Sequence, residues 1–320
     1  MKNQIGKWLS ILVPLLLGVG IIVYQYNSFT EAQINEIKSY FKNADYFYIY
    51  LSLVIALFGF WSRAYRWKFS LQHLGYEAKF HNNFMAVCIA YLMNLTVPRS
   101  GEISRALVLK KYEKIPFDKA FGTIVAERVV DLLIFFLFVF IGFVVQFNVL
   151  KSYVLEKIPY EKLILLLILG ILGIIVFTLI WIYSNWEIVN KLKEKFSGLI
   201  EGMTSILKME NKWAFLFHSF FIWFTYLLMF YVTIFALKET SDIGMGAVVI
   251  AFIFGSLTIG FTNSGFGFYP LVIAEIFVLY HVDKPAGIAF GWLVWTSQTI
   301  LMIALGGLSF LFLPILNRNK

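Results

Sequence analysis

The chain has 320 residues, of which 60% are hydrophobic and 14% are charged, and its mean hydropathy is +0.76. This composition excludes an ordinary soluble domain and predicts an all-α polytopic membrane protein, because about 20 apolar residues suffice for a helix to cross a bilayer. The net charge of +8 fits basic loops beside anionic lipid headgroups better than nucleic-acid binding, because the basic residues are spread between apolar segments.

Six apolar segments are long enough to be full spans, and we expect them to form a single transmembrane domain over residues 1–320. In chain order they are Trp8–Tyr26, Tyr46–Trp67, Thr123–Phe147, Lys162–Tyr183, Trp213–Leu237 and Ala286–Leu313. The first segment is too long for a signal peptide and lacks a small-residue cleavage site, so it is predicted to remain as a transmembrane helix.

Two weaker apolar regions lie between these spans. Asn82–Pro98 is short and ends in polar residues, and Met245–Tyr280 is interrupted by glycines and a proline. Segments of this kind are typical of re-entrant hairpins or broken helices. Lys and Arg are commoner in the loops on one side, which puts both termini in the cytoplasm if each weak region returns to its own side.

The first weak region would then enter from the cytoplasm and the second from outside. The two halves therefore read as an inverted repeat, with a broken element at equivalent places, as in many transporters. The alternative is a six-span bundle with two unrelated glycine-rich loops. Between the halves, the segment of about 186–210 has the spacing of an amphipathic helix on the cytoplasmic surface, either a linker or a partner-binding element.

A helix break follows the first weak region. Pro98 ends one helix and Gly101 permits unusual backbone geometry. Ser100 is predicted to cap the helix that begins there.

Polar and charged residues surround this break. Glu102 and Arg105 lie three apart on the new helix and are expected to pair. Arg99 and Asn94 lie at the break, where an arginine beside helix amides makes a ready anion site, and phosphate is the obvious anion of a membrane. The alternative is a loop whose charges anchor it at the headgroups.

A second charged cluster opens the third span. Glu127 and Asp131 are four residues apart on one helix face, and Arg128 is three from Asp131. Carboxylates beside hydrocarbon require partners, and Arg99 or Arg105 are the expected ones. We predict a buried polar network that either binds substrate or holds helices together.

The second weak region has an uncharged break. Asn263, Gly265 and Gly267 offer an amide and bare backbone that suit hydrogen bonding to a headgroup. Glu275 on the following helix and Gln298 in the last span are further polar candidates.

Signatures of enzymes and metal sites are missing from the sequence. It contains no nucleophile elbow, no phosphate-binding loop and no zinc-protease motif. The single cysteine, Cys88, excludes an internal disulfide. The four histidines are scattered without ligand spacing, so we expect no metal and no cofactor.

The two charged clusters resemble the signature of a known family. The matching residues are Asn94, Pro98, Arg99, Gly101, Glu102, Arg105, Ala120, Glu127, Arg128 and Asp131. They are similar to the transmembrane region of lysylphosphatidylglycerol synthases, also called the flippase-like (YbhN-type) membrane family. The second break departs from the family pattern, with Asn263 and Ser264 in place of proline and glycine and Pro270 in place of a glutamate.

This resemblance implies translocation of a phospholipid, or of a polyprenyl-phosphate-linked lipid, between leaflets of a bacterial inner membrane. In bifunctional members a soluble C-terminal domain transfers the aminoacyl group, and this sequence is expected to lack it because it ends after its last span. Membrane lipids with anionic headgroups are the expected partners. The alternatives are a lipid-modifying transferase like a phosphatidylglycerol lysyltransferase, with Glu127 or Asp131 as its base, and a non-transporting partner subunit of a synthase. Besides lipids, the candidate partners are a synthase and further copies of the chain in a homo-oligomer.

Overall fold

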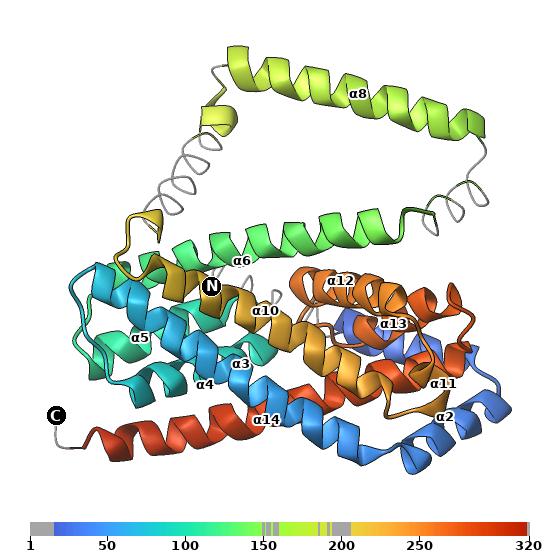
Figure 1. The fold of residues 1–320 in the computed structure, drawn as a ribbon, viewed down its shortest axis with the longest axis horizontal. Helices are drawn as coiled ribbons and strands as arrows, with labels where there is room; N and C mark the ends of the chain where they lie inside the picture. Colours follow the sequence, from blue (N-terminus) through green and yellow to red (C-terminus); the bar gives the residue numbers. More distant parts are fainter. Residues whose placement is uncertain are drawn as a thin grey trace, which may run out of the picture.

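The computed structural model describes residues 16–148, 151, 155, 160–184, 186–190, 193 and 206–318. Apart from turns and short connections these residues are helical, with no strand among them, so the all-α prediction is confirmed. A helical segment at 16–28 comes first (Figure 1). The elements that follow are α2 (Glu31–Asn43), α3 (Tyr46–His73), α4 (Phe80–Thr96), α5 (Ser100–Tyr112), α6 (Phe117–Val145), α8 (Tyr160–Tyr183), α10 (Lys212–Ile234), α11 (Lys238–Ser241), α12 (Met245–Phe261), α13 (Phe268–Val278) and α14 (Lys284–Leu316).

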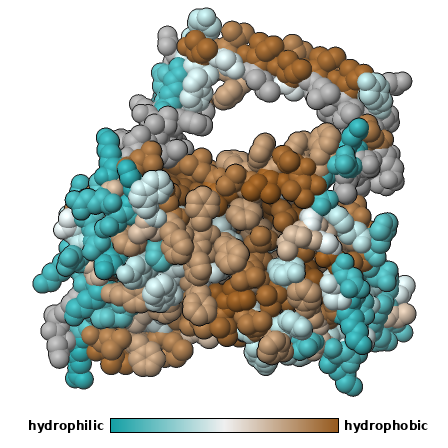
Figure 2. Space-filling view, viewed as in Figure 1, coloured by the Kyte–Doolittle hydropathy of each residue, from teal (hydrophilic) through white to brown (hydrophobic). Residues whose placement is uncertain are grey.

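Four of the described helices, α3, α6, α10 and α14, are long and apolar enough to cross a membrane. Each contains most of one span expected from the sequence. Figure 2 shows a broad hydrophobic band across the middle of the molecule, with hydrophilic residues gathered at both ends. The chain is therefore a membrane-embedded protein.

The two remaining expected spans are described only in part. Residues 8–15 of the first lie outside the described residues, and the helical segment 16–28 contains the rest. The fourth corresponds to α8, which is drawn away from the other helices in Figure 1 and has mostly exposed side chains among those described. Most of the expected amphipathic linker at 186–210 also lies outside the described residues.

Both weak apolar regions form helical hairpins. In each hairpin a first arm of 17 residues, α4 or α12, is followed by a tight tip and a shorter arm, α5 or α13. The sequence bounded the first weak region at Pro98 and predicted a new helix from about Ser100, but it did not predict that this helix is the second arm of the hairpin. In the structure α5 returns along α4 and buries Ala106, Val108 and Leu109 against it and its neighbours.

The hairpins occupy equivalent places in two halves of opposite direction. The order helix, hairpin, helix occurs first as α3, α4–α5 and α6, and again as α10, α12–α13 and α14. Figure 1 shows that α3 runs opposite to α10 and that α6 runs opposite to α14. The two hairpins consequently enter from opposite ends of the bundle, which is the arrangement expected of an inverted repeat.

Each hairpin packs against its own apolar core. One core joins α4 and α5 to the end of α3 and the start of α6, around Trp67, Ile89 and Leu109. The other joins α12 and α13 to the end of α10 and the start of α14, around Phe277 and Phe290. Because the cores lie at opposite ends, the hairpin tips are directed toward the middle of the bundle.

The first helical segment rests against the tip of the second hairpin. The side-chain amide of Gln25 donates a buried hydrogen bond to the carbonyl oxygen of Gly267 over 3.1 Å. A Cβ atom added at Gly267 would lie 2.5 Å from the carbonyl oxygen of Gly18. Glycine is therefore required here by the close approach of two backbones.

Candidate functional site

The tips of the two hairpins meet. The Asn263 amide donates to the backbone oxygen of Leu95 over 3.4 Å, and the Ser264 hydroxyl donates to that of Asn94 over 3.2 Å. One hairpin comes from each half of the chain, so this contact lies at the interface of the repeats. Broken helices that meet in this way place irregular backbone inside the protein rather than against lipid.

The first tip is shaped by Asn94 and Gly101. The Asn94 side-chain oxygen accepts a hydrogen bond from the backbone N–H of Gly101 over 2.7 Å and thus satisfies an open amide at the start of α5. A Cβ atom at Gly101 would lie 2.2 Å from the carbonyl oxygen of Ala90, so only glycine allows the arms to approach this closely.

The expected capping role of Ser100 is wrong. Its hydroxyl donates to the carbonyl oxygens of Met93 and Val97 at the end of the preceding helix instead. Arg99 is the residue at the N-terminal boundary of α5, and its φ of 62° places it in the left-handed region. A non-glycine residue in that region is strained, and of the four described non-glycine residues with positive φ, Arg99 and Ser264 lie at the hairpin tips, which makes Arg99 a functional candidate.

The second tip is a turn of backbone and hydroxyl groups. The Thr262 hydroxyl accepts from the N–H of Gly265, and the Trp295 indole donates to the carbonyl oxygen of Ser264 over 2.8 Å. Gly265 has a φ of +80° and Gly267 a φ of +75°. Together with Ser264, whose φ is 53°, these two glycines give the turn its left-handed backbone conformation.

A cavity of about 640 Å³ lies beside the joined tips. Its polar lining comes from both hairpins, from α6 and from α14. The polar and charged lining residues are Tyr91, Asn94, Arg99, Glu102, Arg128, Thr262, Asn263, Ser264, Tyr269, Trp295, Gln298 and Thr299. Arg99 lines this cavity with an exposed side chain and forms no ion pair with any described residue. It is thus a cation available to a ligand.

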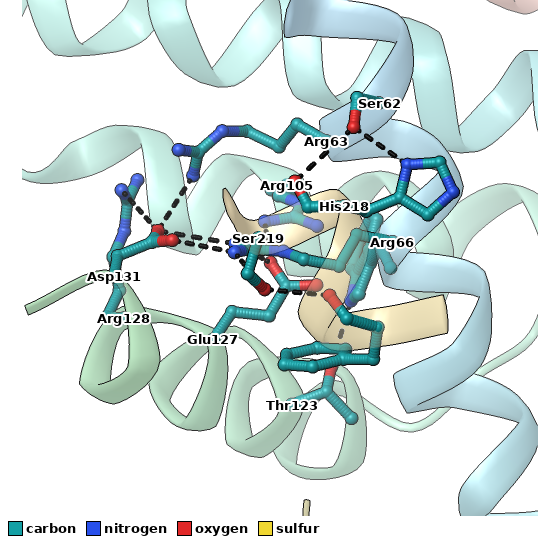
Figure 3. A network of polar contacts seen from close by, with 12 residues as sticks. Ser62, Arg63, Arg66, Arg105, Thr123, Glu127, Arg128, Asp131, His218 and Ser219 are labelled. Carbon is teal, nitrogen blue, oxygen red and sulfur yellow. Dashed lines mark hydrogen bonds and ion pairs between the residues drawn. The ribbon is translucent and has the colours of Figure 1, made fainter. Parts of the chain in front are cut away.

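A network of buried charges, here called the arginine cluster, lies next to this cavity. It consists of Arg63 and Arg66 on α3, Arg105 on α5, and Glu127 and Asp131 on α6 (Figure 3). The side chains of all five are at most 8% exposed. Buried charges of this kind are stable only when paired and hydrogen-bonded.

Asp131 is the most heavily paired carboxylate. It accepts from Arg66 over 2.6 and 3.2 Å and from Arg63 over 3.3 Å, and Arg128 approaches it at 3.6 Å. One helical turn earlier, Glu127 accepts from Arg105 over 2.9 Å and from Arg66 over 3.4 Å. Charge-assisted bonds of this number fix α3, α5 and α6 relative to one another.

Arg105 has spare donor capacity. Its guanidinium stacks over the Trp67 ring at 3.7 Å, and the Trp67 indole donates to Thr123 over 2.9 Å. Its Nη2 atom is buried and has no hydrogen-bond partner among the described residues. Arg105 also lines a second cavity, of about 20 Å³, together with Arg63, Glu102 and Arg128. That volume accommodates one water molecule or one ligand oxygen.

Two connections link the large cavity to the arginine cluster. Arg128 donates to Glu102 in the cavity over 2.7 Å and also lies near Asp131. Tyr91, which lines both cavities, shares a hydrogen bond with Tyr226, and the Tyr226 hydroxyl accepts from Arg63 over 3.2 Å. A ligand in the cavity would therefore contact the groups that hold the cluster together.

The structure brings most of the candidate residues together. Asn94, Arg99, Glu102, Arg128 and Asn263 line the large cavity. The other three charged candidates, Arg105, Glu127 and Asp131, lie in the arginine cluster. The predicted buried network around Glu127 and Asp131 is confirmed as a set of contacts, including the expected pairing of Arg105 with Glu127.

Other expectations are corrected. Glu102 pairs with Arg128 rather than Arg105, because Arg105 is directed to Glu127 and Trp67 on the inner side of α5. Arg99 pairs with neither Glu127 nor Asp131 of α6. Gly265 and Gly267 shape the second tip but do not line the cavity.

Two further candidates also have definite places. Gln298 lines the cavity. Glu275 lies away from it and forms an exposed ion pair with Lys284 over 2.6 Å.

Sequence reasoning missed Arg63 and Arg66, which read as basic residues at the end of a span. A signal for them was nevertheless present, because five of the six arginines of the chain fall within residues 63–128. In the structure these five lie in the cavity or the cluster, and no described lysine lies there. Arginine is the residue suited to buried ion pairs and to phosphate recognition, because its planar fork of donors binds oxygens two at a time.

Comparison with known proteins gives two matches. Residues 11–307 match the family described as the lysylphosphatidylglycerol synthase TM region. The chain is also 27% identical over 298 residues to the UPF0104 membrane protein MJ1595 of Methanocaldococcus jannaschii, an alignment that covers 83% of this chain and 84% of the relative. No solved structure matches the chain.

Proposed function

The chain belongs to the lysylphosphatidylglycerol synthase TM region family, and on this premise we propose that it moves a lipid between the leaflets of a membrane. The substrate would be a phospholipid or a polyprenyl-phosphate-linked lipid, with its phosphate in the large cavity and its chains in the bilayer. The membrane would be a bacterial inner membrane, with both termini on the cytoplasmic side.

The observation that carries this proposal is the cavity between the hairpin tips. It lies where the two inverted halves meet, which is where transporters with inverted repeats bind their substrates. Its lining combines the unpaired cation of Arg99 with Arg128, the amide of Asn263 and several hydroxyls. These are the groups that bind a phosphate and its ester oxygens.

The apolar rim of the cavity suits a lipid with its tails outside. Ile259 and Phe261, at the end of α12, line the cavity and are 47% and 84% exposed. Exposed apolar side chains on a membrane-embedded helix are solvated by acyl chains. A headgroup can consequently bind in the cavity while the tails stay in the hydrocarbon.

The test is translocation of fluorescent phospholipids and polyprenyl-phosphate lipids by purified protein in liposomes. Arg99→Ala should slow translocation at least tenfold because it removes the unpaired cation. Arg318→Ala is the matched control, since Arg318 is exposed, follows the end of α14 and lines neither cavity. Equal rates for wild type and Arg99→Ala would contradict the site. A new lipid species in the same liposomes would favour the transferase alternative.

Association with a synthase or with a second copy stays a prediction. The segment expected to mediate it, at 186–210, is mostly outside the described residues. Deleting that segment and following co-purification would test the role of a partner subunit.

A further inference from the structure

The charges around the two cavities do not balance. Five guanidiniums line a cavity or belong to the arginine cluster, and three carboxylates accompany them. The residues are Arg63, Arg66, Arg99, Arg105 and Arg128, with Glu102, Glu127 and Asp131. Arginine stays protonated in proteins, and each carboxylate is paired with at least one guanidinium. The site without a ligand therefore carries a surplus of two positive charges.

Such a surplus is unfavourable in this setting. Uncompensated charge near hydrocarbon is expensive, and the arginine cluster is almost wholly removed from solvent. The surplus is also concentrated toward the cavities. Arg99 forms no ion pair with a described residue. Among the described residues the buried Nη2 atom of Arg105 has no hydrogen-bond partner, nor does one carboxylate oxygen each of Glu102 and Glu127, so the net surplus rests on the excess of guanidiniums over carboxylates. A site built in this way is completed by an anion.

The two cavities together match a terminal phosphate. They share Tyr91, Asn94, Glu102 and Arg128 in their linings, so the small one adjoins the large one. The small cavity holds one oxygen-sized group and offers it the free donor of Arg105. A phosphomonoester has three unesterified oxygens, one of which can enter the small cavity while the others face Arg99 and Arg128.

We propose that the cavity selects lipids whose headgroup ends in a phosphomonoester, and disfavours phosphodiester and cationic headgroups. A phosphomonoester carries a charge of about −1.5 to −2 near neutral pH, which matches the surplus of two. A phosphodiester supplies one negative charge, so one of the two surplus positive charges stays uncompensated. A lysylated headgroup is a net cation and is repelled by the site. This inference rests on the proposed function for its choice of a lipid as the ligand.

The test compares lipids with identical acyl chains in binding to the full-length protein in detergent. The probes are phosphatidic acid, phosphatidylglycerol, lysylphosphatidylglycerol and inorganic phosphate. Phosphatidic acid should bind at least tenfold tighter than phosphatidylglycerol, and lysylphosphatidylglycerol should bind weakest. Equal affinity for the first two lipids, or a preference for the lysylated lipid, would overturn the proposal. Inorganic phosphate that competes as well as phosphatidic acid would overturn the lipid as the source of the phosphate.

Charge variants test whether the surplus causes this selectivity. Arg99→Gln lowers the surplus by one and should reduce the preference for phosphatidic acid by about tenfold, the size expected for one ionic hydrogen bond. Glu102→Gln raises the surplus by one and should strengthen phosphatidic acid binding, whereas a purely structural Glu102 would give weaker or unchanged binding. Arg318→Gln should leave both affinities unchanged. Unchanged selectivity in Arg99→Gln would contradict the charge argument.

Translocation assays with the same lipids separate this inference from the transport function. Selective binding of phosphatidic acid without translocation of any lipid would refute transport and leave the headgroup assignment standing. Translocation of all the lipids at one rate would support transport and overturn the headgroup selectivity.

Discussion

The Ser264 hydroxyl donates a hydrogen bond to the backbone oxygen of Asn94 over 3.2 Å, although 170 positions separate the two residues in the chain. This bond and the neighbouring bond from Asn263 to Leu95 join the two hairpin tips, which come from opposite halves of the chain, into one continuous surface. The large cavity depends on this joined surface, because Asn94, Leu95, Asn263 and Ser264 all line the cavity. Movement of one hairpin away from the other would therefore change the shape of the cavity.

A cross-linking experiment tests this contact. In a Cys88→Ala background, the pair Leu95→Cys and Ser264→Cys should be joined by a short bifunctional thiol reagent, because the tips are in hydrogen-bonding contact. The control pair is Leu95→Cys with Gly244→Cys. Gly244 precedes the 17-residue helix α12, which places it about 25 Å from the tip at 1.5 Å per residue. Equal cross-linking of both pairs, measured by mobility on a denaturing gel, would contradict the hairpin geometry.

Replacing Asp131 should strongly destabilise the protein. Asp131→Asn removes the charge that compensates Arg63 and Arg66, and breaking one partner of a buried ion pair typically costs about 3–5 kcal/mol. Asp118→Asn, at an exposed position in the first turn of the same helix, should cost less than about 1 kcal/mol. Reversible unfolding in denaturant, followed in detergent micelles, measures both. A small effect at Asp131 would indicate that the arginines find other partners.

The first hairpin should not tolerate a side chain at Gly101. In Gly101→Ala the new methyl group would meet the Ala90 carbonyl oxygen at 2.2 Å, so the two arms must separate. Gly122→Ala is the control, since no atom lies within 4 Å of a Cβ there, and alanine in a helix is favoured over glycine by about 1 kcal/mol. Thermal unfolding should show a lower Tm for Gly101→Ala and an equal or higher Tm for Gly122→Ala. Similar shifts for both would contradict the close packing.

Lysine should not substitute for Arg105. Arg105→Lys keeps the charge but loses the planar group that stacks on Trp67 at 3.7 Å and bonds to Glu127. A desolvated stacking contact of this type contributes about 2 kcal/mol, so the variant should unfold at lower denaturant concentration. Arg318→Lys, on an exposed residue, should be neutral. If both lysine variants were as stable as wild type, the stacking would contribute nothing.

The spans and the hairpins could be predicted because their signals are local. Hydrophobic runs of sufficient length and the breaks at Pro98 and Gly265 are readable within a window of about 20 residues. A helix starting near Ser100 was predicted, but its return along α4 as the second arm of the hairpin was missed for a physical reason. Polar and apolar residues are balanced in α5, as they are in a surface loop. Only the packing of α5 on α4 shows which face of the helix is buried.

Pairing within the site was predictable only in part. Contacts along one helix, such as Arg128 with Asp131, follow from spacing. Contacts between helices depend on rotation about each helix axis, which no spacing reveals. Hence Glu102 was assigned to Arg105, on its own helix, although it pairs with Arg128 on α6. In the sequence Arg63 and Arg66 are basic residues at the end of a span, and only the position of Asp131 beside them identifies them as buried ions.

The left-handed backbone at Arg99, with its φ of 62°, lowers the stability of the fold at a residue whose side chain is proposed to bind the ligand. Glycine adopts this conformation without strain, whereas an arginine there costs about 1 kcal/mol. Arg99→Gly should therefore give a protein that is more stable and less active, an outcome that alanine cannot produce because it keeps the strain. A search for thermostable variants of this chain would select against its unpaired cation, so stability screens and activity screens should disagree at this position.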